Sequence, residues 1–599
     1  MPTLGRNEVQ EEFKWNLRDL FASDEEWRRR KKEMVARLSR LDEFKGTLSA
    51  SSVRLLDALN YLSELEKEFI LIAAYATMLS DQDTRQSEPL AMKQEMVQLR
   101  TQLSSAASFI EPEILRIPEQ MLNAYLDENV GLSPYRHSLE DAMRRREHTL
   151  DDVQERLIAE AGLMADTAEE AHSILVNADM PYRVIKLSDG TDAKIDPTGY
   201  TLHRTRQQRE DRINVFNAFF EVLKGFERTL GTELYGELKK NLFYREVRKY
   251  RSCLESALFP DNIPEKVYLN LLENVNANLP SLHRYLELRK RLLGLDQLHY
   301  YDLYPSMVKE VDLRFSYGEA KKAVLDAMAP LGGEYLGVLN RALSERWIDV
   351  LPNEGKRAGA YMEGHAYDVH PYVLTNFNGR YDDVSTLAHE LGHAVHSSFS
   401  NHYQHFANSS YPIFLAEVAS TVNEALLMNY HLERIKDKAE RVSLLGGYLE
   451  GFRTTMFRQT QFAEFELRIH EAAEGGEALA GERLTSMYLD ILKRYYGHEK
   501  ICVIDDLYGV EWAYIPHFYM DFYVYQYATS FTASQAIASR IIEGDKDLIE
   551  RYIGMLKSGS SEYAIPTLKK VGVDMLSREP FDLAMKRMNE IIAEIEDLI

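Results

Sequence analysis

The feature that most constrains the fold of this chain is the run His389-Glu390-Leu391-Gly392-His393, which lies in a stretch with helical periodicity. Residues four apart in an α-helix stand one above the other on a single face, so His389 and His393 can bind one metal ion together. Histidines at this spacing are typical of Zn²⁺ sites, and a glutamate beside the first can deprotonate a metal-bound water. The run therefore predicts a helix, one Zn²⁺ per chain, and Glu390 as a general base.

The spacing of the nearby carboxylates indicates the third metal ligand. Zinc sites of this type take a carboxylate from a second element. In the thermolysin and aminopeptidase patterns that carboxylate falls on positions held here by Pro412 and Ile413. The metzincin pattern requires a glycine and a third histidine where this chain has His396 and Phe399. Glu417 lies farther along the chain at another known spacing, and we expect it to be the third ligand.

A second helix is expected to carry Glu417. Pro412 precedes it and is a favourable residue for the first turn of a helix. Glu417 and Glu424 are seven residues apart and therefore share one helical face. We interpret Glu424 as a partner that hydrogen-bonds and orients one of the ligand imidazoles.

The metal-binding run is one of four segments that share a resemblance; the others are residues 13–21, 414–424 and 515–519. Together they resemble oligoendopeptidase F of the thimet-oligopeptidase family of zinc peptidases, from near residue 13 to the end of the chain. The resemblance implies a mainly α, two-lobed, multi-helical zincin-like fold with a deep substrate channel and a small β-sheet near the active site. It also implies cleavage of internal bonds in short, unfolded peptides.

The pattern along the chain and this resemblance predict three regions. Residues 1–115 form an N-terminal helical region, and residues 116–200 form an oligopeptidase F-type helical subdomain that ends in a small hairpin. Residues 201–599 form the catalytic zinc peptidase domain. The hairpin is expected near residues 183–195, where β-forming residues flank the turn sequence Ser188-Asp189-Gly190-Thr191-Asp192.

Residues 355–379 interrupt the helical pattern and are rich in glycine, tyrosine and β-forming residues. Tyr372–Phe377 is the clearest strand. The resemblance implies that this strand and residues 359–362 belong to a small sheet beside the metal site. An exposed edge strand there could pair with extended substrate backbone. The alternative is a structural hairpin without substrate contact.

The segment from Tyr508 to Phe531 is rich in aromatic residues at helical spacing, which is most often a sign of packing in the core. Tyrosine is unusual in a dry core because its hydroxyl needs a partner. The resemblance implies that a histidine and a tyrosine of this segment stabilise the oxyanion, and His517 matches the histidine. Tyr527 is the first candidate for the tyrosine and Tyr523 the second, since they are four residues apart and share a helical face.

Five other polar residues near these motifs are interpreted as structural or peripheral. His396 follows the metal run by one turn and is expected to pack or to hydrogen-bond a ligand. His365 and His370 lie in the strand region and could touch substrate, although a single histidine is more often structural. Asp382 and Asp383 precede the metal run and are expected to cap the helix N-terminus, where negative charge is favourable.

Composition excludes several classes of partner. The formal charge is −23 and 45% of the residues are hydrophobic, which describes a globular protein and argues against nucleic acid or an anionic membrane. The longest apolar run, around Phe69–Ala76, is too short to span a membrane, and no signal peptide is visible. Cys253 and Cys502 are the only cysteines, and as two free buried thiols they fit a reducing cytoplasm.

These observations favour a cytoplasmic zinc endopeptidase that acts on short peptides. One alternative of the same clan is a dipeptidyl carboxypeptidase. An alternative of another class is a helical peptide-binding protein that has lost catalysis, which the presence of Glu390, all three metal ligands and His517 disfavours. No sequence feature indicates a peptide preference or an oligomeric state.

Overall fold

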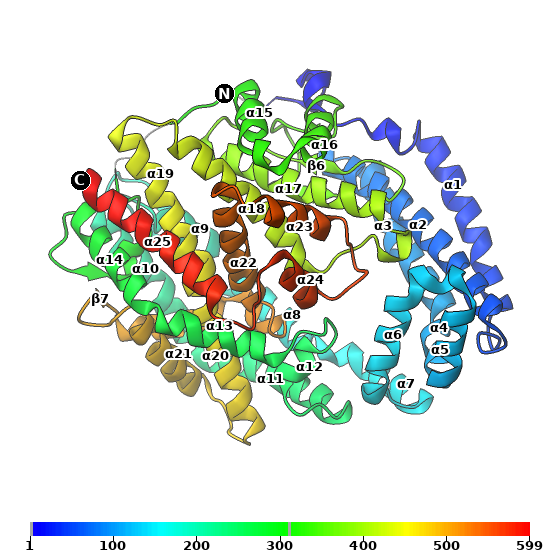
Figure 1. Cartoon of the computed structure of the whole chain (residues 1–599). Coiled ribbons are helices and arrows are strands. Elements are labelled where there is room, and N and C mark those ends of the chain that lie inside the picture. The colour runs from blue at the N-terminus through cyan, green and yellow to red at the C-terminus, as the bar shows by residue number, and fades with distance from the viewer. Residues whose placement is uncertain (1–3, 309–312) are drawn as a thin grey trace. The chain divides into compact units, whose positions relative to one another are not determined.

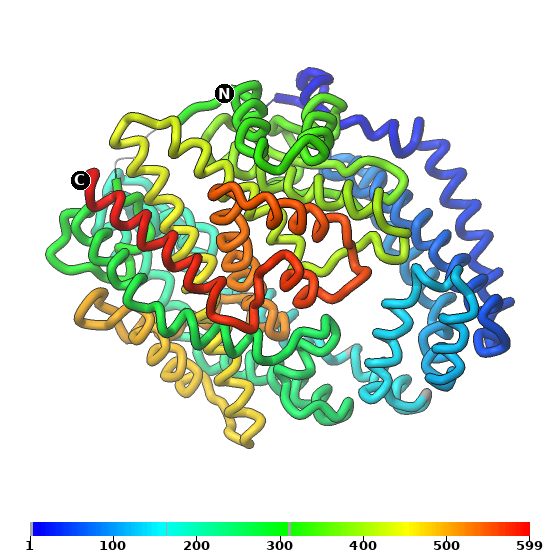
Figure 2. The backbone as a smooth tube through the Cα atoms, viewed as in Figure 1, coloured from blue at the N-terminus to red at the C-terminus, as the bar shows by residue number. Residues whose placement is uncertain are grey.

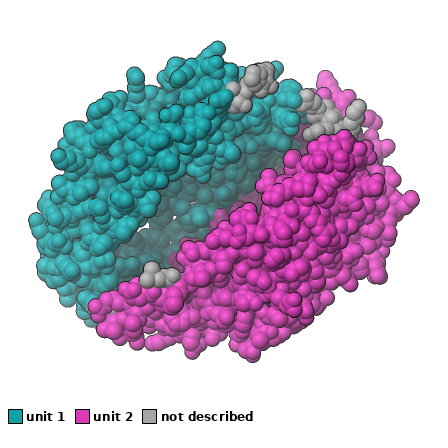
Figure 3. Space-filling view, turned by 180° about the vertical axis from the view of Figure 1, so that it is seen from behind, with its two compact units in different colours: residues 1–147, 312–433, 537–573 teal, residues 148–311, 434–536, 574–599 magenta. Residues whose placement is uncertain are grey.

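The computed structural model describes residues 4–308 and 313–599, and most of them lie in helices (Figure 1). Contacts within the chain divide it into two compact units. Unit 1 comprises residues 1–147, 312–433 and 537–573, and unit 2 comprises residues 148–311, 434–536 and 574–599. Figure 2 follows the backbone by colour along the sequence, and Figure 3 gives each unit its own colour. Each unit is therefore assembled from three separate stretches of chain.

Unit 1 contains the N-terminal helices and the helices that carry the metal-binding motif. Its helices are α1 (Asp24–Arg37), α2 (Ser52–Gln82), α3 (Ser87–Ala107), α4 (Ile110–Arg116), α5 (Glu119–Glu128), α6 (Arg136–Arg145), α15 (Tyr317–Ala327), α16 (Gly333–Ser344), α17 (Tyr381–Tyr403), α18 (Ile413–Leu432), α23 (Lys546–Leu556) and α24 (Ala564–Val571). The long α2 packs against both α1 and α3. Trp27 of α1 is completely buried there, and its indole N–H donates to the Ile72 carbonyl at 2.9 Å.

Unit 2 is also helical. Its helices are α7 (Asp152–Ala165), α8 (Thr167–Ile174), α9 (Pro197–His203), α10 (Arg209–Gly225), α11 (Glu227–Val247), α12 (Cys253–Leu258), α13 (Glu265–Ala277), α14 (Leu279–Leu292), α19 (Lys438–Gly451), α20 (Arg458–Glu474), α21 (Gly481–Tyr495) and α25 (Glu579–Leu598). Helix α22 (Tyr525–Ile542) begins in unit 2 and ends in unit 1. Cys253 and Cys502 are both buried and free, as expected.

The strands of the described residues are short. In unit 2, β1 (Val184–Lys186) and β2 (Asp192–Lys194) form the expected antiparallel hairpin, with Ile185 opposite Ala193. A second pair, β3 (Leu298–His299) and β7 (Cys502–Val503), is parallel. The prediction of a mainly helical chain with small sheets is confirmed.

Unit 1 holds a three-stranded sheet that includes the two strands expected within residues 355–379 and a third strand, β4 (Ile348–Asp349), that was not predicted. It consists of β4, β6 (Tyr372–Leu374) and β5 (Tyr361–Glu363) in that order. The central strand β6 is parallel to β4 and antiparallel to β5, with Met362 opposite Val373. The strand expected over 372–377 is thus regular only to Leu374.

The N-terminal segment of unit 1 is anchored to this sheet by aromatic packing. Trp15 is 3% exposed, and its ring makes edge contacts with Tyr361 of β5 and Tyr372 of β6 at centroid distances of 6.4 and 6.1 Å. The Tyr372 hydroxyl donates to the Asn16 carbonyl at 2.9 Å. Trp15 and Tyr372 belong to one hydrophobic cluster with residues of α1, α2 and α3, and Tyr361 packs against this cluster.

Among the residues that the structure describes, no helix has both the length and the apolar character that a membrane span requires. The three regions predicted from the sequence, residues 1–115, 116–200 and 201–599, are each continuous in the chain, whereas each compact unit combines separate stretches. That division remains a prediction.

Candidate active site

The metal-binding run lies in the middle of α17, as predicted. The helix begins after Arg380, and the Asp383 carboxylate accepts the backbone N–H groups of Asn378 and Arg380, each at 2.9 Å. This carboxylate satisfies donors before the first turn and places negative charge at the positive end of the helix. Asp383 thus has the capping role expected of it, and Asp382 lies beside it in the first turn.

Three side chains from α17 and α18 converge on one point in unit 1. His389 Nε2 lies 3.2 Å from His393 Nε2 and 3.6 Å from Glu417 Oε2. One ligand atom from each residue lies within 4.8 Å of the others. A tetrahedral zinc site with Zn–N bonds of about 2.0–2.1 Å places neighbouring ligand atoms about 3.3–3.5 Å apart. The separations therefore fit a single metal ion of this size.

The outer nitrogens of the two imidazoles are held by other groups. His389 Nδ1 lies 3.2 Å from Glu424 Oε1, the contact expected from the spacing of the two glutamates. His393 has a hydrogen bond with the Ala416 backbone. A ligand histidine bonded through one nitrogen presents the other nitrogen to the metal in a set orientation. The His389 imidazole is therefore oriented with Nε2 toward Glu417, and His393 Nε2 faces His389 Nε2.

The pKa values of the two histidines differ because of their neighbours. Burial lowers the pKa of His389, but the hydrogen bond and charge of Glu424 outweigh it and raise that pKa to about 9. Burial and the adjacent His389 charge lower the pKa of His393 to about 3. A metal ion bound at this point would have to displace the proton from His389, whereas His393 is already neutral.

Glu390 is suited to proton transfer. The residue is 7% exposed, and burial raises its pKa to about 7, while the His389 charge opposes the rise. A carboxylate with a pKa near neutrality can both accept and return a proton. A bound cation at the three ligands would lower this pKa, since it favours the charged form.

The close contact of α17 and α18 depends on a glycine within the metal-binding run. A Cβ atom on Gly392 would lie 2.7 Å from Ser420 Cα and 2.8 Å from the Ala419 carbonyl oxygen. Side chains other than hydrogen therefore cannot occupy position 392 without separating the helices. The glycine at the fourth position of the run is a packing requirement, which the sequence alone did not indicate.

Two further residues join the helices near the site. The side-chain amide of Asn423 donates to the Ala388 carbonyl at 3.0 Å, and its oxygen accepts the Tyr335 hydroxyl at 2.7 Å. Asn423 and Tyr335 are both fully buried. Asn423 lies next to Glu424 in the sequence. A polar residue within this largely apolar helix could have indicated that its side chain has a specific buried partner.

The sheet of unit 1 lies against the metal-binding helix. Strand β5 contacts α17, and a Cβ on Gly364 at its end would lie 2.4 Å from Ser397 Oγ. Among the residues that the structure describes, β5 pairs with β6 alone, so it is an edge strand of the sheet. The predicted sheet beside the site is confirmed, and substrate pairing by β5 remains a prediction.

The aromatic segment lies in unit 2. His517 is in the 3-10 helix η13 (Pro516–Tyr519), and its ring centroid is 6.3 Å from Tyr523 and 6.1 Å from Tyr527. The two tyrosine rings are 5.3 Å apart. Burial lowers the pKa of His517, so its imidazole is neutral at pH 7 and can donate a hydrogen bond.

One detail of this segment was predicted incorrectly. Tyr523 and Tyr527 were expected to share one helical face, but α22 begins only at Tyr525. A turn at Asp521 and Phe522, both with positive φ, comes directly before Tyr523, which lies outside the regular helix. The geometry brings both tyrosines near His517 and does not select one of them.

The three other histidines considered in the sequence analysis, His365, His370 and His396, lie outside the cluster of candidate ligands. His396 is fully buried and stacks on Tyr411 at 3.6 Å between ring centroids, so it packs as expected. His370 stacks on Trp347 at 4.6 Å and lies 3.1 Å from Asp19. The His365 side chain is 69% exposed, with Nδ1 3.2 Å from Glu363 Oε1, and remains accessible.

Comparison with known proteins extends the likeness over nearly the whole chain. Residues 202–587 match the sequence profile of peptidase family M3, and residues 113–182 match that of oligopeptidase F. The oligopeptidase PepF of Bacillus subtilis (strain 168) is 42% identical, over 99% of this chain and 88% of PepF. The group B oligopeptidase PepB of Streptococcus agalactiae serotype III is 37% identical, over 99% of this chain and 98% of PepB. The crystal structure of oligoendopeptidase-F from Enterococcus faecium has a TM-score of 0.74 and 33% identity, covering 96% of this chain and 99% of that chain.

Proposed function

The chain belongs to peptidase family M3 and is a metallopeptidase of oligopeptides, and we propose that it holds one Zn²⁺ and hydrolyses internal bonds of short, unfolded peptides. The observation that carries this proposal is the convergence of His389, His393 and Glu417 within 4.8 Å, with Glu390 beside them on α17. This arrangement supplies three protein ligands and leaves one tetrahedral position open, which is typical of a catalytic zinc site.

Each residue of the proposed site has a distinct task. A zinc ion held by the three ligands would supply Lewis-acid chemistry, which would acidify the attacking water and polarise the scissile carbonyl. The Glu390 carboxylate takes a proton from that water and later returns it to the leaving nitrogen. Glu424 holds the His389 imidazole in the orientation that points Nε2 toward the metal position.

The developing negative charge on the carbonyl oxygen requires donors. We assign this task to His517 and to one hydroxyl, that of Tyr527 or Tyr523. A neutral imidazole and a phenol are both donors, and such groups lower the barrier when they are aimed at the oxyanion. Support comes from the clustering of the three rings in unit 2 and from the lowered pKa of His517.

The substrates we propose are short peptides that lie extended along β5. An edge strand offers unpaired backbone donors and acceptors, which bind peptides without regard to most side chains. The proposed location is the cytoplasm, since the two cysteines are free thiols. We propose no nucleic-acid or membrane partner. The oligopeptidase relatives do not favour the dipeptidyl carboxypeptidase or the inactive binding protein.

Digestion of a mixed peptide library with mass-spectrometric mapping of the cut positions tests this function. We expect cuts at internal bonds, in peptides with amidated as well as free C-termini. Strict release of C-terminal dipeptides that amidation abolishes would establish the carboxypeptidase alternative. Absence of any cleavage by the zinc-loaded protein would establish the inactive alternative.

A further inference from the structure

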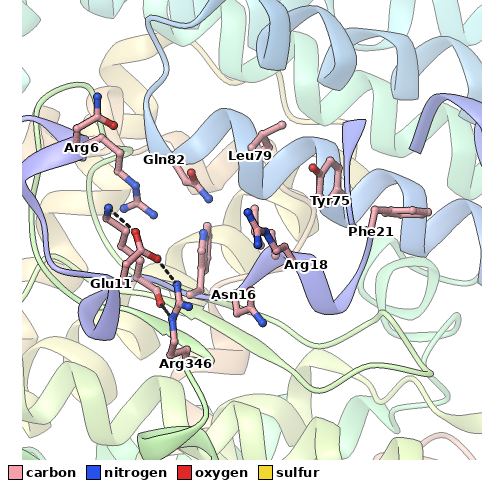
Figure 4. Close-up of a pocket in the computed structure, with 14 residues that line it drawn as sticks. Arg6, Glu11, Asn16, Arg18, Phe21, Tyr75, Leu79, Gln82 and Arg346 are labelled. Carbon is pink, nitrogen blue, oxygen red and sulfur yellow. Dashed lines mark hydrogen bonds and ion pairs between the residues drawn. The ribbon is translucent and has the colours of Figure 1, made fainter. Parts of the chain in front are cut away.

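A cavity of about 340 Å³ lies in unit 1 between the N-terminal segment and the end of α2, away from the metal ligands in sequence (Figure 4). Trp15, Phe21, Tyr75 and Leu79 form its apolar wall. Four cationic side chains also line it, but only one carboxylate; these five residues are Arg6, Glu11, Lys14, Arg18 and Arg346. In a chain with a formal charge of −23, such a concentration of positive charge is a local exception.

The Glu11 carboxylate does not balance the cations around it. One of its oxygens lies 3.0 Å from Lys14 Nζ and the other 2.7 Å from Arg346 Nη2. Figure 4 shows these contacts as dashed lines at one side of the cavity. A single carboxylate shared by two cations leaves one positive charge in excess.

The carboxylate of Asp349 is likewise shared by two cations, so it does not cancel the positive charge of both. Arg6 Nη1 lies 2.8 Å from Asp349 Oδ1, and Lys356 Nζ lies 2.7 Å from the same oxygen. Asp24 accepts the Tyr75 hydroxyl at 2.7 Å, and Asp19 accepts the side-chain amide of the lining residue Asn16 at 2.9 Å. With both carboxylates counted, five cations face four carboxylates, so one positive charge remains in excess.

Arg18 supplies the group most open to a ligand. Its guanidinium has no hydrogen bond or ion pair with the residues that the structure describes, and Figure 4 places it among the lining side chains. Arginine and lysine side chains are hydrogen-bond donors only. A lining with surplus donors and surplus positive charge matches a ligand with surplus acceptors and negative charge.

We propose that this cavity binds a small oxyanion, with Arg18 as its principal ligand. The shared chemistry is that of a carboxylate or a phosphate, and both are recognised by the planar donor fork of arginine. The volume is within the range of small-molecule sites. The site is independent of the proposed peptidase mechanism.

The test follows the indole signals in ¹⁵N-labelled zinc-loaded protein. The chain has four tryptophans, and the Trp15 signal is assigned with Trp15→Phe. The Trp15 indole N–H has no partner in the cavity wall, which makes it a sensitive reporter. Inorganic phosphate and N-acetylglycine are titrated at constant ionic strength, with uncharged N-acetylglycinamide as the control. We expect a saturable shift with at least one anion and none with the amide; the anion that acts identifies the source.

Substitution of Arg18 decides whether the response belongs to this cavity. Arg18→Gln should weaken the affinity by about tenfold or more, since it removes a charge-assisted hydrogen bond. Arg29→Gln, on the exposed surface of α1, should leave it unchanged. No saturable shift with either anion, or equal affinity in Arg18→Gln, would overturn the proposal.

A different observation, in unit 2, concerns the turn that precedes α22. Asp521 and Phe522 are consecutive residues with φ of 45° and 58°. Left-handed backbone is unfavourable for residues that carry a Cβ, and such residues are retained where surrounding contacts enforce them. The next residue is Tyr523, one of the two candidates for the oxyanion hydroxyl.

The contact that enforces this turn comes from α20. The Phe522 N–H donates to Glu466 Oε1 at 2.7 Å, and Glu466 is completely buried. The Phe522 ring is 1% exposed and lies 4.5 Å from the His470 ring and 5.6 Å from the Tyr268 ring. The other carboxyl oxygen of Glu466 has no partner among the described residues. Burying such an oxygen is unfavourable, so stability alone does not account for a glutamate here.

We infer that Glu466 is a positioning residue that fastens the 521–522 turn and thereby places the hydroxyls of Tyr523 and Tyr527 near His517. The inference rests on the proposed function of these three residues. Glu466 acts through the backbone of Phe522 and does not itself touch the substrate.

Steady-state kinetics with a quenched fluorescent peptide and zinc-loaded enzyme tests the inference. Glu466→Leu removes the acceptor and should lower kcat about tenfold or more, with little change in KM. Glu466→Gln retains an acceptor oxygen and should restore kcat. The control is Thr460→Val, which also removes a buried hydrogen bond of α20 and should keep kcat. The melting temperatures of both variants are measured, so that any loss of stability is compared directly.

The outcomes separate this inference from the proposed function. If the wild-type protein has no peptidase activity, the proposed function fails. If the wild-type protein is active but Glu466→Leu retains kcat, or loses no more than Thr460→Val, the positioning role fails. Loss in Glu466→Gln as large as in Glu466→Leu would also contradict it.

Discussion

Helices α17 and α18 of unit 1 and the aromatic segment of unit 2 hold their candidate reactive side chains by different structural means. In unit 1, two regular helices cross so closely that Gly392 is required, and hydrogen bonds fix both imidazoles. In unit 2, His517 lies in a 3-10 helix and Tyr523 follows a turn with two positive φ angles. The proposed metal ligands are thus held by packing of regular helices, and the proposed oxyanion donors are held by a strained turn.

The difference has a consequence for function. A metal site needs its ligands at fixed separations before the ion binds. Donors to an oxyanion must favour the transition state over the substrate, so their useful position differs slightly from the resting one. Regular helices suit the first requirement, and an irregular segment can suit the second. The following predictions test this contrast, from the largest expected effect to the smallest.

Removal of one metal ligand should abolish activity. His393→Ala deletes a neutral imidazole that lies 3.2 Å from His389 Nε2, so both bound zinc and turnover should be lost. Zinc content by mass spectrometry and peptide hydrolysis provide the measurement. His370→Gln, outside the cluster, should retain one zinc. Full zinc content in His393→Ala would contradict the assigned ligands.

Glu390→Gln should separate catalysis from binding. The variant keeps the shape of the side chain but cannot accept a proton, so turnover should fall by about 10⁴-fold. Zinc content and peptide affinity should remain near those of the wild type, because Glu390 is not proposed as a ligand. Cleavage at a near wild-type rate would refute the mechanism.

One tyrosine hydroxyl should matter far more than the other. Tyr527→Phe and Tyr523→Phe each remove a hydroxyl and little volume, and the one that binds the oxyanion should lower kcat by about 10²–10³-fold. Peptide affinity and melting temperature should change little in both variants. Normal kcat in both would leave His517 as the only side-chain donor of this segment.

Gly392→Ala should weaken the helix contact that holds the ligands. A Cβ there would meet Ser420 Cα at 2.7 Å, so we expect a loss of about 1–3 kcal/mol in the free energy of unfolding, with weaker zinc binding. Gly447→Ala in α19, where a Cβ meets nothing within 4 Å, should be neutral or stabilising by about 0.5–1 kcal/mol. Equal effects of the two changes would show that the close helix contact is not required.

Stability of unit 2 should decline with rising pH because of Glu237. Burial raises the pKa of this fully buried carboxyl to about 7, despite Lys240 at 2.7 Å. A carboxyl whose folded pKa is raised above its unfolded value binds its proton more tightly in the folded state. Its contribution is present below pH 4.5 and is lost as pH rises through 7. Urea unfolding should show this decline in the wild type and a smaller one in Glu237→Gln.

The elements that the sequence predicted well depend on local periodicity. The helix around His389, the spacing of Glu417 and Glu424, and the strand near Tyr372 follow from patterns within about ten residues. These are features that a single element determines by itself. The positions of the candidate ligands on their helices could therefore be predicted from the sequence, and their role as metal ligands remains a prediction.

The features that were not predicted depend on through-space approach. In the sequence, nothing distinguishes Gly392 from other residues of its helix; its importance follows from the close approach of Ser420. Glu466 had one sequence signal, because it lies among Phe462, Phe465 and Ile469 on the apolar face of α20. The turn at 521–522 had none, since neither residue is a glycine. Such positions are determined by partners that are far away in the sequence.

The discontinuous composition of the two units also governs how the protein can be made. Unit 1 includes residues 537–573 and unit 2 includes residues 574–599, so neither is complete until almost the whole chain has been synthesised. Helices α17 and α18 leave the ribosome well before their last partners. Apolar surface of both units is thus exposed during translation, when partly folded chains are most prone to aggregate. We expect nascent chains of this protein to depend on chaperones more than those of proteins of the same length with sequential domains.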